Sequence, residues 1–366
     1  MVLVLYTFKF PLTIIHIRVK YYAYMNTSRN KSGQHYLLSA EARTLSLMQI
    51  MRLSDDEAFE MFKSARWKDG EPVCPQCGGV EHYWLKTRKQ WRCKHKECNH
   101  SFSVTSGTLF ANAKMPLRVY IAAIALYSNC AKGMSALQMS RDLDVQYKTA
   151  FVLMHKMRES LGEPPQQLEG EVEMDGAYFN GHVRLRNNIN NRVDRRLKVN
   201  QDPNKRAILV ARQRGPEGTG AVETVVAVAK SENEKTALAF AKKHVVKSAT
   251  ITTDEHVSYN ALRGQFKVER VNHQINYVGP EGQSTNQAES FFSRLRRMHI
   301  GQTHKFGNNY LDRYAREAAY REDTRRRPNG HIFHDIMGRC ATKRPSREFC
   351  GYWQGNKKMS ENLLIS

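Results

Sequence analysis

The spacing of apolar residues divides the chain into a helical first half and a second half of mixed strands and helices. From Pro116 to about Leu161, apolar residues recur at three- and four-residue steps, which predicts helices. These positions begin with Leu117, Ile121, Ile124 and Ala125. An earlier helix is predicted to start at Ser54, a capping residue followed by three acids. Glu163-Pro164-Pro165 then breaks the chain, and we place a domain boundary there.

Strands are predicted beyond this boundary, where apolar residues recur at every second position. Val172 and Met174 alternate with acidic residues, which predicts a strand that ends at Asp175. The other predicted strands are 207–211, 222–229, 249–254 and 266–271, and the predicted helices are 233–246 and 286–299. This succession predicts a mixed α/β domain. From about Gly330 onward the chain is basic and poorly patterned.

The composition favours a folded protein with a polyanionic partner. The 366 residues are 41% hydrophobic, which excludes a mainly disordered chain. With 57 Lys and Arg against 35 Asp and Glu, the net charge is +22, which points most often to nucleic acid. Ribosomal or membrane-surface binding would give the same number, so charge alone names no activity. No apolar run reaches the roughly 20 residues of a membrane helix, and we expect a cytoplasmic protein without membrane contact.

The chain start carries a separate hypothesis. Residues 1–24 are apolar but interrupted by Lys9, Arg18 and Lys20, and no cleavage site follows them. We expect Met25 to be the true start and 1–24 not to belong to the native protein. An intact mass that retains Met1 would contradict this.

Four of the seven cysteines are clustered in a pattern typical of a zinc ribbon. They are Cys74, Cys77, Cys93 and Cys98, while Cys130, Cys340 and Cys350 are scattered. An odd total with one tight group indicates a metal site in a reducing compartment rather than a disulfide framework. Four thiolates on two turns fit tetrahedral zinc, and Trp91 and Phe102 are predicted to form a small core beside them. The alternatives are buried or redox-active cysteines, with His95 or His100 as substitute ligands.

A helix-turn-helix unit is predicted after the cysteine segment. Its helices are 135–143 and 147–161, joined by a turn at 144–146. Such a unit suits entry into the DNA major groove, with Gln146, Tyr147 and Lys148 exposed at the start of the second helix. The alternative is an ordinary helical hairpin, but the position after a zinc ribbon in a strongly basic chain favours DNA binding.

Three acids at the ends of predicted elements form a candidate metal site. Asp175 and Asp254 end strands, and Glu289 lies on the helix that begins near Asn286. Three converging carboxylates would hold two divalent cations about 3.5–4 Å apart, an arrangement suited to phosphodiester chemistry. Hard oxygen ligands select Mg²⁺ or Mn²⁺ rather than zinc.

Each acid also has a simpler explanation. Asp175 is the last of an acidic series that would form a solvated face, after Glu169, Glu171 and Glu173. Asp254 would begin a turn, with Glu255 as a competing ligand. Glu289 follows Asn286 at the spacing of a capping box. Three such coincidences in a strongly basic chain are harder to accept than one site.

The last predicted helix carries both an acid and cations. Its apolar stripe is Ala288, Phe291, Phe292, Leu295 and Met298. Glu289 and Arg296 are two turns apart and share one face, so both would point into one groove.

Two basic stretches flank the candidate metal site. Residues 181–214 hold ten basic against two acidic residues, and residues 294–327 hold ten against four. Such runs are often only solvated faces, but beside a metal site they favour phosphate binding. The predicted DNA-binding residues are Arg184, Arg186, Arg195, Arg196, Arg296, Arg297 and Lys148.

Several stretches together resemble the transposases of bacterial insertion sequences, in the subgroup with an N-terminal zinc ribbon ahead of a DDE, RNase-H-like core. Residues 285–297, TNQAESFFSRLRR, are similar to that family's third-acid signature, and Gly301 and His304 follow as in the group. The remaining stretches are 253–256 around Asp254, 174–178 around Asp175, and SGTLF at 106–110. The resemblance covers roughly residues 45–335.

The resemblance implies Asp175, Asp254 and Glu289 as the catalytic triad, with two Mg²⁺ or Mn²⁺ ions and one structural Zn²⁺. Two positions depart from the family: Gly176 stands where a second acid is usual, and Arg296 where Lys is common. Some relatives have Asn as the third catalytic residue, so Asn286 remains a rival to Glu289.

The resemblance and the pattern together predict five parts of the chain. These are an N-terminal segment at 1–70, a zinc ribbon at 71–110, a helix-turn-helix-like region at 115–162, an RNase-H-like catalytic domain at 166–335 and a C-terminal tail at 336–366. The expected function is Mg²⁺-dependent cleavage at element ends and strand transfer into target DNA, by a homo-oligomer that binds terminal inverted repeats, in a bacterial cytoplasm at the nucleoid. The alternatives are a DNA-binding regulator, a domesticated inactive transposase, and a nuclease that cuts without joining.

Overall fold

The structure is a computed structural model, and its described residues all belong to one compact unit, Tyr36–Ser366. Within this unit it describes residues 36–162, 167–181, 185–194, 197–216, 219–271, 284–349, 351–355 and 360–365. The predictions made for 1–24, Arg184, Arg195, Arg196 and Cys350 lie outside the described residues. No helix within the described ranges is long and apolar enough to cross a membrane.

A three-stranded antiparallel sheet forms the cysteine segment. Its strands are β1 (His82–Leu85), β2 (Gln90–Cys93) and β3 (Ser101–Ser103), in the order β1-β2-β3. Trp91 pairs with Phe102 across β2 and β3, both are buried, and their rings stack 5.7 Å apart. The predicted small core beside the cysteines is confirmed.

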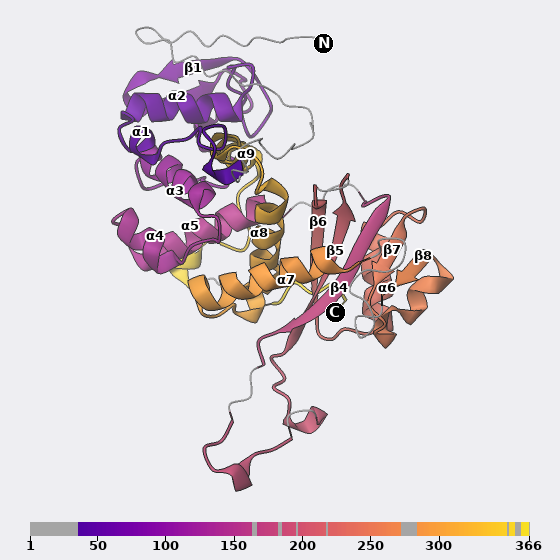
Figure 1. Ribbon diagram of the computed structural model, residues 1–366. Coiled ribbons are helices and arrows are strands. Elements are labelled where there is room, and N and C mark those ends of the chain that lie inside the picture. The colour runs from indigo at the N-terminus through magenta and orange to yellow at the C-terminus, as the bar shows by residue number, and fades with distance from the viewer. Residues whose placement is uncertain are drawn as a thin grey trace. The chain divides into compact units, whose positions relative to one another are not determined.

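Five helices surround one core with this segment (Figure 1). They are α1 (Leu47–Met51), α2 (Asp55–Arg66), α3 (Leu117–Asn129), α4 (Ala136–Asp142) and α5 (Tyr147–Ser160). The predicted start of α2 is confirmed, because Ser54 and Glu57 form a capping box. The two helices and the turn predicted at 135–161 are also present as α4 and α5. Their binding to DNA remains a prediction.

A further helix from the C-terminal region completes this core. Helix α9 (Asn329–Thr342) contacts α2, α3 and α5, and it buries Phe333, Met337 and Cys340. The prediction of a poorly patterned chain from Gly330 is therefore wrong for this stretch. The apolar residues of α9 follow helical spacing, but their burial depends on partners far away in the sequence.

The second half of the chain is a five-stranded mixed sheet. Its strands are β4 (Glu171–Phe179), β5 (Arg206–Arg214), β6 (Ala221–Ala229), β7 (Thr250–Thr253) and β8 (Lys267–Arg270). The order is β6-β5-β4-β7-β8, with β4, β5 and β6 antiparallel and β4, β7 and β8 parallel. The predicted mixed α/β class is confirmed.

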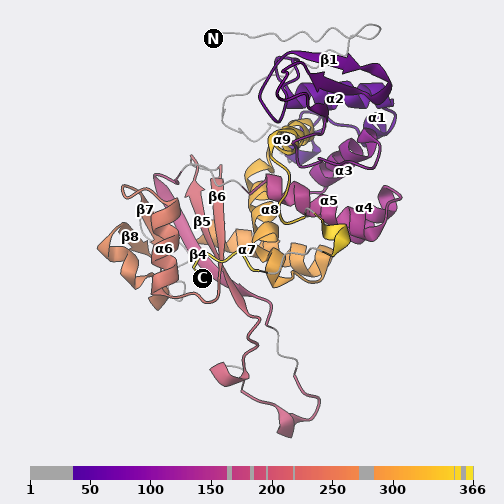
Figure 2. The same cartoon turned by 180° about the vertical axis from the view of Figure 1, so that it is seen from behind.

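Helices cover both faces of this sheet (Figures 1 and 2). Helices α7 (Asn286–Met298) and α8 (Leu311–Thr324) pack against Ala177 and Ile208 on one face. On the other face, α6 (Glu234–His244) and the 3-10 helix Val257–Gly264 pack against strand residues that include Met174, Leu209 and Ile251. Shorter helical turns are Tyr36–Leu38, Lys86–Arg88, Ile189–Asn191, Lys198–Asn200, His299–Thr303, Asn308–Tyr310 and Tyr352–Gln354.

Strand β4 is longer than the sequence pattern predicts. Asp175 lies in its middle, paired with Val210 of β5, and the strand continues to Phe179. The predicted strand end at Asp175 is therefore wrong. Pairing with β7 involves only residues 171–173, so the edge of β4 near Asp175 extends beyond the end of β7. A long hairpin connection, residues 180–205, joins β4 to β5 (Figure 1).

A buried ion network connects α5 to α8. Arg158 on α5 contacts Glu317 on α8 at 2.6 Å, and both side chains are at most 2% exposed. Arg321, one turn further along α8, contacts the same carboxylate at 2.7 Å. Burial is the largest single influence on the pKa of Glu317 and raises it, but the two guanidinium groups together outweigh burial. The pKa of this carboxyl is therefore lowered. The helical region is thus fastened to a helix that packs on the mixed sheet.

Candidate active site and zinc site

The four clustered cysteines form the better-defined metal site. The Sγ atoms of Cys74, Cys77, Cys93 and Cys98 all lie within 4.8 Å of one another. Among the residues that the structure describes, no other group of three or more Cys, His, Asp or Glu residues places its ligand atoms this close together. The predicted quartet is confirmed, and neither His95 nor His100 belongs to it. Four converging thiolates are the donor set that fits structural zinc.

Local backbone geometry brings the first pair of thiols together. The Gly78 N–H donates to the Cys74 carbonyl at 2.9 Å, and Gly78 adopts φ +76°, a left-handed conformation that glycine tolerates. The Gly79 N–H donates to Cys77 Sγ at 3.4 Å. This bond is the largest cause that lowers the pKa of the Cys77 thiol to about 7. The turn therefore favours the thiolate, the form that binds a metal.

Aromatic packing joins the zinc site to the rest of the helical core. The ring of Trp91 on β2 lies 5.7 Å from Phe59 on α2 and 4.8 Å from Trp84 on β1. Arg66, at the end of α2, donates to the carbonyl oxygens of Val104 at 2.6 Å and Ser106 at 2.5 Å. The cysteine segment is consequently part of a larger core, in which α2 bridges the small sheet and the other helices.

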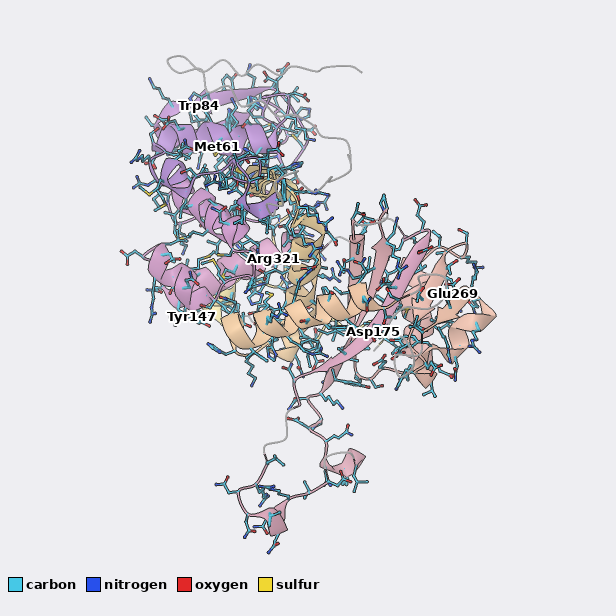
Figure 3. All side chains as sticks on the ribbon, viewed as in Figure 1. Met61, Trp84, Tyr147, Asp175, Glu269 and Arg321 are labelled. Carbon is cyan, nitrogen blue, oxygen red and sulfur yellow. The ribbon has the colours of Figure 1, made fainter. Side chains whose placement is uncertain are left out.

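The three predicted acids come from three neighbouring elements of the mixed sheet. Asp175 is on β4, Asp254 directly follows β7, and Glu289 is in the first turn of α7. The pKa of Asp175 is raised to about 7, chiefly by burial and also by the charges of Asp254 and Glu289, against a 2.7 Å hydrogen bond from the Gly176 N–H that lowers it. The charges of Asp254 and Glu289 therefore act on Asp175, which is labelled in Figure 3.

The acids are less tightly grouped than the thiols. Within the described ranges, their oxygen atoms do not form a set of three that lie within 4.8 Å of one another. Carboxylates that repel one another around the half-buried Asp175 are a chemically suitable donor set for divalent cations, because a bound cation offsets the repulsion. Oxygen donors of this type fit Mg²⁺ or Mn²⁺.

A fourth acid, Glu232, was missed by the sequence analysis. A Cβ atom built on Gly176 would lie 2.5 Å from the Glu232 carboxylate, so this side chain fills the space beside Gly176. The Tyr259 hydroxyl donates to Glu232 Oε1 at 2.6 Å, and the Glu232 N–H donates to the Tyr178 hydroxyl at 3.1 Å. The charge of Glu232 also raises the pKa of Asp175. The sequence signals Glu232 only indirectly, because Gly176, directly after Asp175, leaves room for another side chain.

The start of α7 does not follow the capping-box explanation of Glu289. Asn286 is the first residue of the helix, whereas the N-cap is Thr285, which makes no side-chain capping bond. The predicted apolar stripe from Ala288 to Met298 is confirmed, because all of its five residues are buried. Glu289 is exposed on the same helix, as are both Asn286 and Arg296.

The predicted DNA-binding residues differ in their exposure. Arg296 and Arg297 are exposed on α7, and Arg186 is exposed in the hairpin connection. Lys148 is half-buried, with its amine 5.5 Å from the ring of Tyr352, so its predicted exposure is only partly met. The neighbouring Tyr147, labelled in Figure 3, is 55% exposed.

Two stretches of the chain match known protein families. Residues 167–323 match the ISXO2-like transposase domain, and residues 53–101 match the transposase zinc-ribbon domain. The chain therefore carries an IS1595-family DDE transposase domain with an N-terminal transposase zinc ribbon, as the sequence resemblance predicts.

Two individual proteins were also aligned with this chain. An uncharacterized protein in transposable element ISH50 of Halobacterium salinarum is 25% identical over 217 residues, covering 57% of this chain and 70% of the relative. The simian T-cell lymphotropic virus intasome in complex with PP2A regulatory subunit B56 gamma aligns with a TM-score of 0.25 and 12% identity. That alignment covers 53% of this chain and 66% of the other.

The raised pKa of Asp175 predicts a pH-dependent cost of folding. Between the ordinary value of 3.8 and about 7, the folded protein holds a proton that the unfolded chain has lost, so stability falls as pH rises. In buffer without Mg²⁺ or Mn²⁺, wild type is expected to lose roughly 2–4 kcal/mol relative to Asp175→Asn over this range. Denaturant unfolding at a series of pH values measures it, and parallel curves for the two proteins would contradict it.

Proposed function

We propose that the protein is an active DNA transposase, which cleaves DNA at the ends of an insertion sequence and joins the freed 3′-hydroxyl groups to target DNA. The observation that supports this most is that the charges of Asp254 and Glu289 act on Asp175 within a chain segment that matches a transposase domain. A protein that only binds DNA has no use for acids gathered toward its polyanionic partner.

Three acids of the chain would hold the cations that phosphoryl transfer requires. Asp175, Asp254 and Glu289 would hold two divalent cations, which when bound polarise a phosphodiester and stabilise the attacking and leaving oxygens. Asp175 is fixed within a paired strand, Asp254 directly follows β7, and Glu289 lies in the first turn of α7. No protein nucleophile is required, so no covalent protein–DNA intermediate is expected.

Exposed cations near these acids would hold the DNA backbone. Arg296 and Arg297 lie on the helix that carries Glu289, and the basic hairpin connection follows the strand that carries Asp175. The zinc ribbon and the α4–α5 unit would recognise the terminal inverted repeats. Because two ends must be joined, a homo-oligomer is expected on DNA.

This arrangement predicts DNA binding that depends steeply on salt. Replacing Arg296 and Arg297 with Ala should weaken binding about tenfold and reduce the slope of log affinity against log salt by about 1–2, because fewer counterions are released. The matched control replaces Lys242 and Lys243, two exposed cations on α6 at the opposite face of the sheet. Fluorescence anisotropy between low and physiological salt gives both slopes, and equal losses for the two variants would contradict the assignment.

An assay with labelled DNA that carries the element ends, unlabelled target DNA and Mg²⁺ tests the proposed function. Cleaved ends and joined products support a transposase. Cleavage without joining supports a nuclease, and binding without either product supports a regulator or a domesticated transposase.

A further inference from the structure

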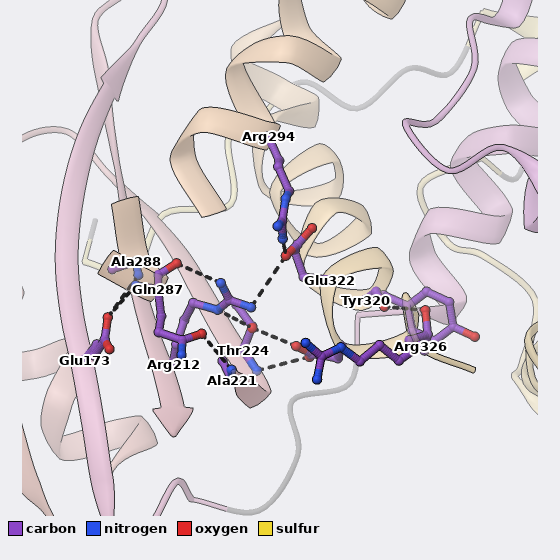
Figure 4. Close-up of polar contacts among 12 residues, drawn as sticks. Glu173, Arg212, Ala221, Thr224, Gln287, Ala288, Arg294, Tyr320, Glu322 and Arg326 are labelled. Carbon is purple, nitrogen blue, oxygen red and sulfur yellow. Dashed lines mark hydrogen bonds and ion pairs between the residues drawn. The ribbon is translucent and has the colours of Figure 1, made fainter. Parts of the chain in front are cut away.

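The first turn of α7 is fastened to three strands of the mixed sheet (Figure 4). The N–H groups of Gln287 and Ala288 donate to Glu173 Oε2 on β4 at 2.8 and 3.2 Å. The Gln287 carbonyl accepts from Arg212 on β5 at 2.7 Å, and the Gln287 side-chain oxygen accepts from the Ala221 N–H on β6 at 2.6 Å. These bonds hold the residue that lies two positions before Glu289.

Glu173 is the charged member of this attachment, and it is fully buried. Its side chain is 0% exposed, and Arg214 on β5 donates to its other oxygen, Oε1, at 2.8 Å. Arg214 also donates to the carbonyl and hydroxyl oxygens of Ser284, just before α7, at 3.0 and 2.7 Å. A carboxylate at a helix N-terminus satisfies N–H groups that have no partner within the helix, and it interacts favourably with the helix dipole.

The position of Glu173 relates it to all three acids of the candidate site. On β4 it lies two residues before Asp175, so both side chains are on the same face of the sheet. In the parallel pairing of β4 with β7 it is opposite Thr252, which lies two residues before Asp254. Through Gln287 it contacts the helix turn that carries Glu289. One buried carboxylate therefore fixes the junction from which the three acids extend.

From this geometry we propose that Glu173 is a positioning residue, which sets the separation of Asp175, Asp254 and Glu289 for cation binding. The inference rests on the proposed function of that site. Outer residues that orient metal ligands typically contribute about 10–100-fold in metal affinity or activity. A merely structural role would instead lower stability and leave the cation affinity of the folded protein unchanged.

The variant Glu173→Gln tests this proposal, because it keeps the size of the side chain but removes its charge. We expect the affinity for Mn²⁺, measured by electron paramagnetic resonance, to fall about tenfold or more, and half-saturating Mg²⁺ for joining to rise in parallel. DNA affinity should stay within about twofold of wild type. Unchanged Mn²⁺ affinity in folded Glu173→Gln would overturn the proposal.

Asp323→Asn is the matched control. Asp323 on α8 accepts hydrogen bonds from the Thr224 N–H at 3.0 Å and from its hydroxyl at 2.7 Å, and these bonds fasten α8 to β6. This variant should lower the melting temperature while it leaves the Mn²⁺ affinity unchanged. An equal fall in Mn²⁺ affinity for Asp323→Asn would show a general effect of loosening the sheet and would overturn the specific role of Glu173.

A second variant covers the case in which Glu173→Gln does not fold. Glu173→Asp keeps the charge but shortens the reach toward α7, and the same decrease in Mn²⁺ affinity is expected. Because Mn²⁺ binding is measured without DNA, a wild type that binds Mn²⁺ but joins no DNA would contradict only the proposed function. A wild type that binds no Mn²⁺ at these acids would overturn both.

Discussion

Replacing Asp254 with Asn is expected to reduce cleavage and joining of element-end DNA by about 10³-fold or more. Asp254 directly follows β7, and its charge acts on the half-buried Asp175. An amide in its place would remove one charged oxygen from the cation site, and stabilisation by bound cations supplies several kcal/mol of the barrier reduction in phosphoryl transfer. A loss of about 4 kcal/mol corresponds to about 10³ in rate.

The neighbouring acid provides a control for this variant. Glu255 is exposed and was the competing ligand in the sequence, so Glu255→Gln should keep activity within about threefold of wild type. Both variants remove one negative charge from the same turn, and neither should weaken DNA binding. Equal joining by wild type and Asp254→Asn would refute the assigned chemistry.

The same assay decides between Glu289 and Asn286 as the third catalytic residue. Both are exposed in the first turn of α7, but only Glu289 carries a charge that raises the pKa of Asp175. Glu289→Gln is therefore expected to lose activity as Asp254→Asn does, while Asn286→Ala retains most of it.

Loss of zinc is expected to have the largest effect on folding. Cys74→Ser removes one of four thiolates, and a structural zinc ion contributes on the order of 10 kcal/mol to the fold of such segments. The aromatic core around Trp91 should lose its packing, and specific binding to element ends should be lost with it. The mixed sheet has a separate core and should remain folded.

Zinc content and hydrogen exchange together measure this effect. Wild type should contain one zinc ion per chain and protect the amides of β1–β3, whereas Cys74→Ser should show neither. Cys130→Ser is the matched control, because Cys130 lies outside the thiol group, and it should retain the zinc. Full protection of β1–β3 in a zinc-free protein would contradict a structural role for the metal.

The sequence was most informative where burial follows a local period. Apolar spacing predicted α4, α5 and the buried stripe of α7, because one face of each helix packs on the core. Alternation likewise predicted β4, but not its length. The extension of β4 to Phe179 depends on pairing with β5, which lies across a long connection, and no local signal marks it.

Acidic side chains were harder to assign, because their environment depends on distant partners. Glu173 belonged to a series that would suit a solvated face, yet the structure buries it completely. What permits this burial is Arg214, together with the N-terminus of α7, which lies more than a hundred residues further along the chain. Glu232 is in a connection without a motif, and only the fold brings it beside Gly176.

The central claim is that Asp175, Asp254 and Glu289 bind divalent cations at one place. Anomalous diffraction from crystals of the protein with Mn²⁺, collected at the manganese absorption edge, tests it most directly. We expect a peak within about 2.5 Å of carboxylate oxygens from these acids. A well-ordered site with the acids apart and manganese bound elsewhere, or nowhere, would contradict the account.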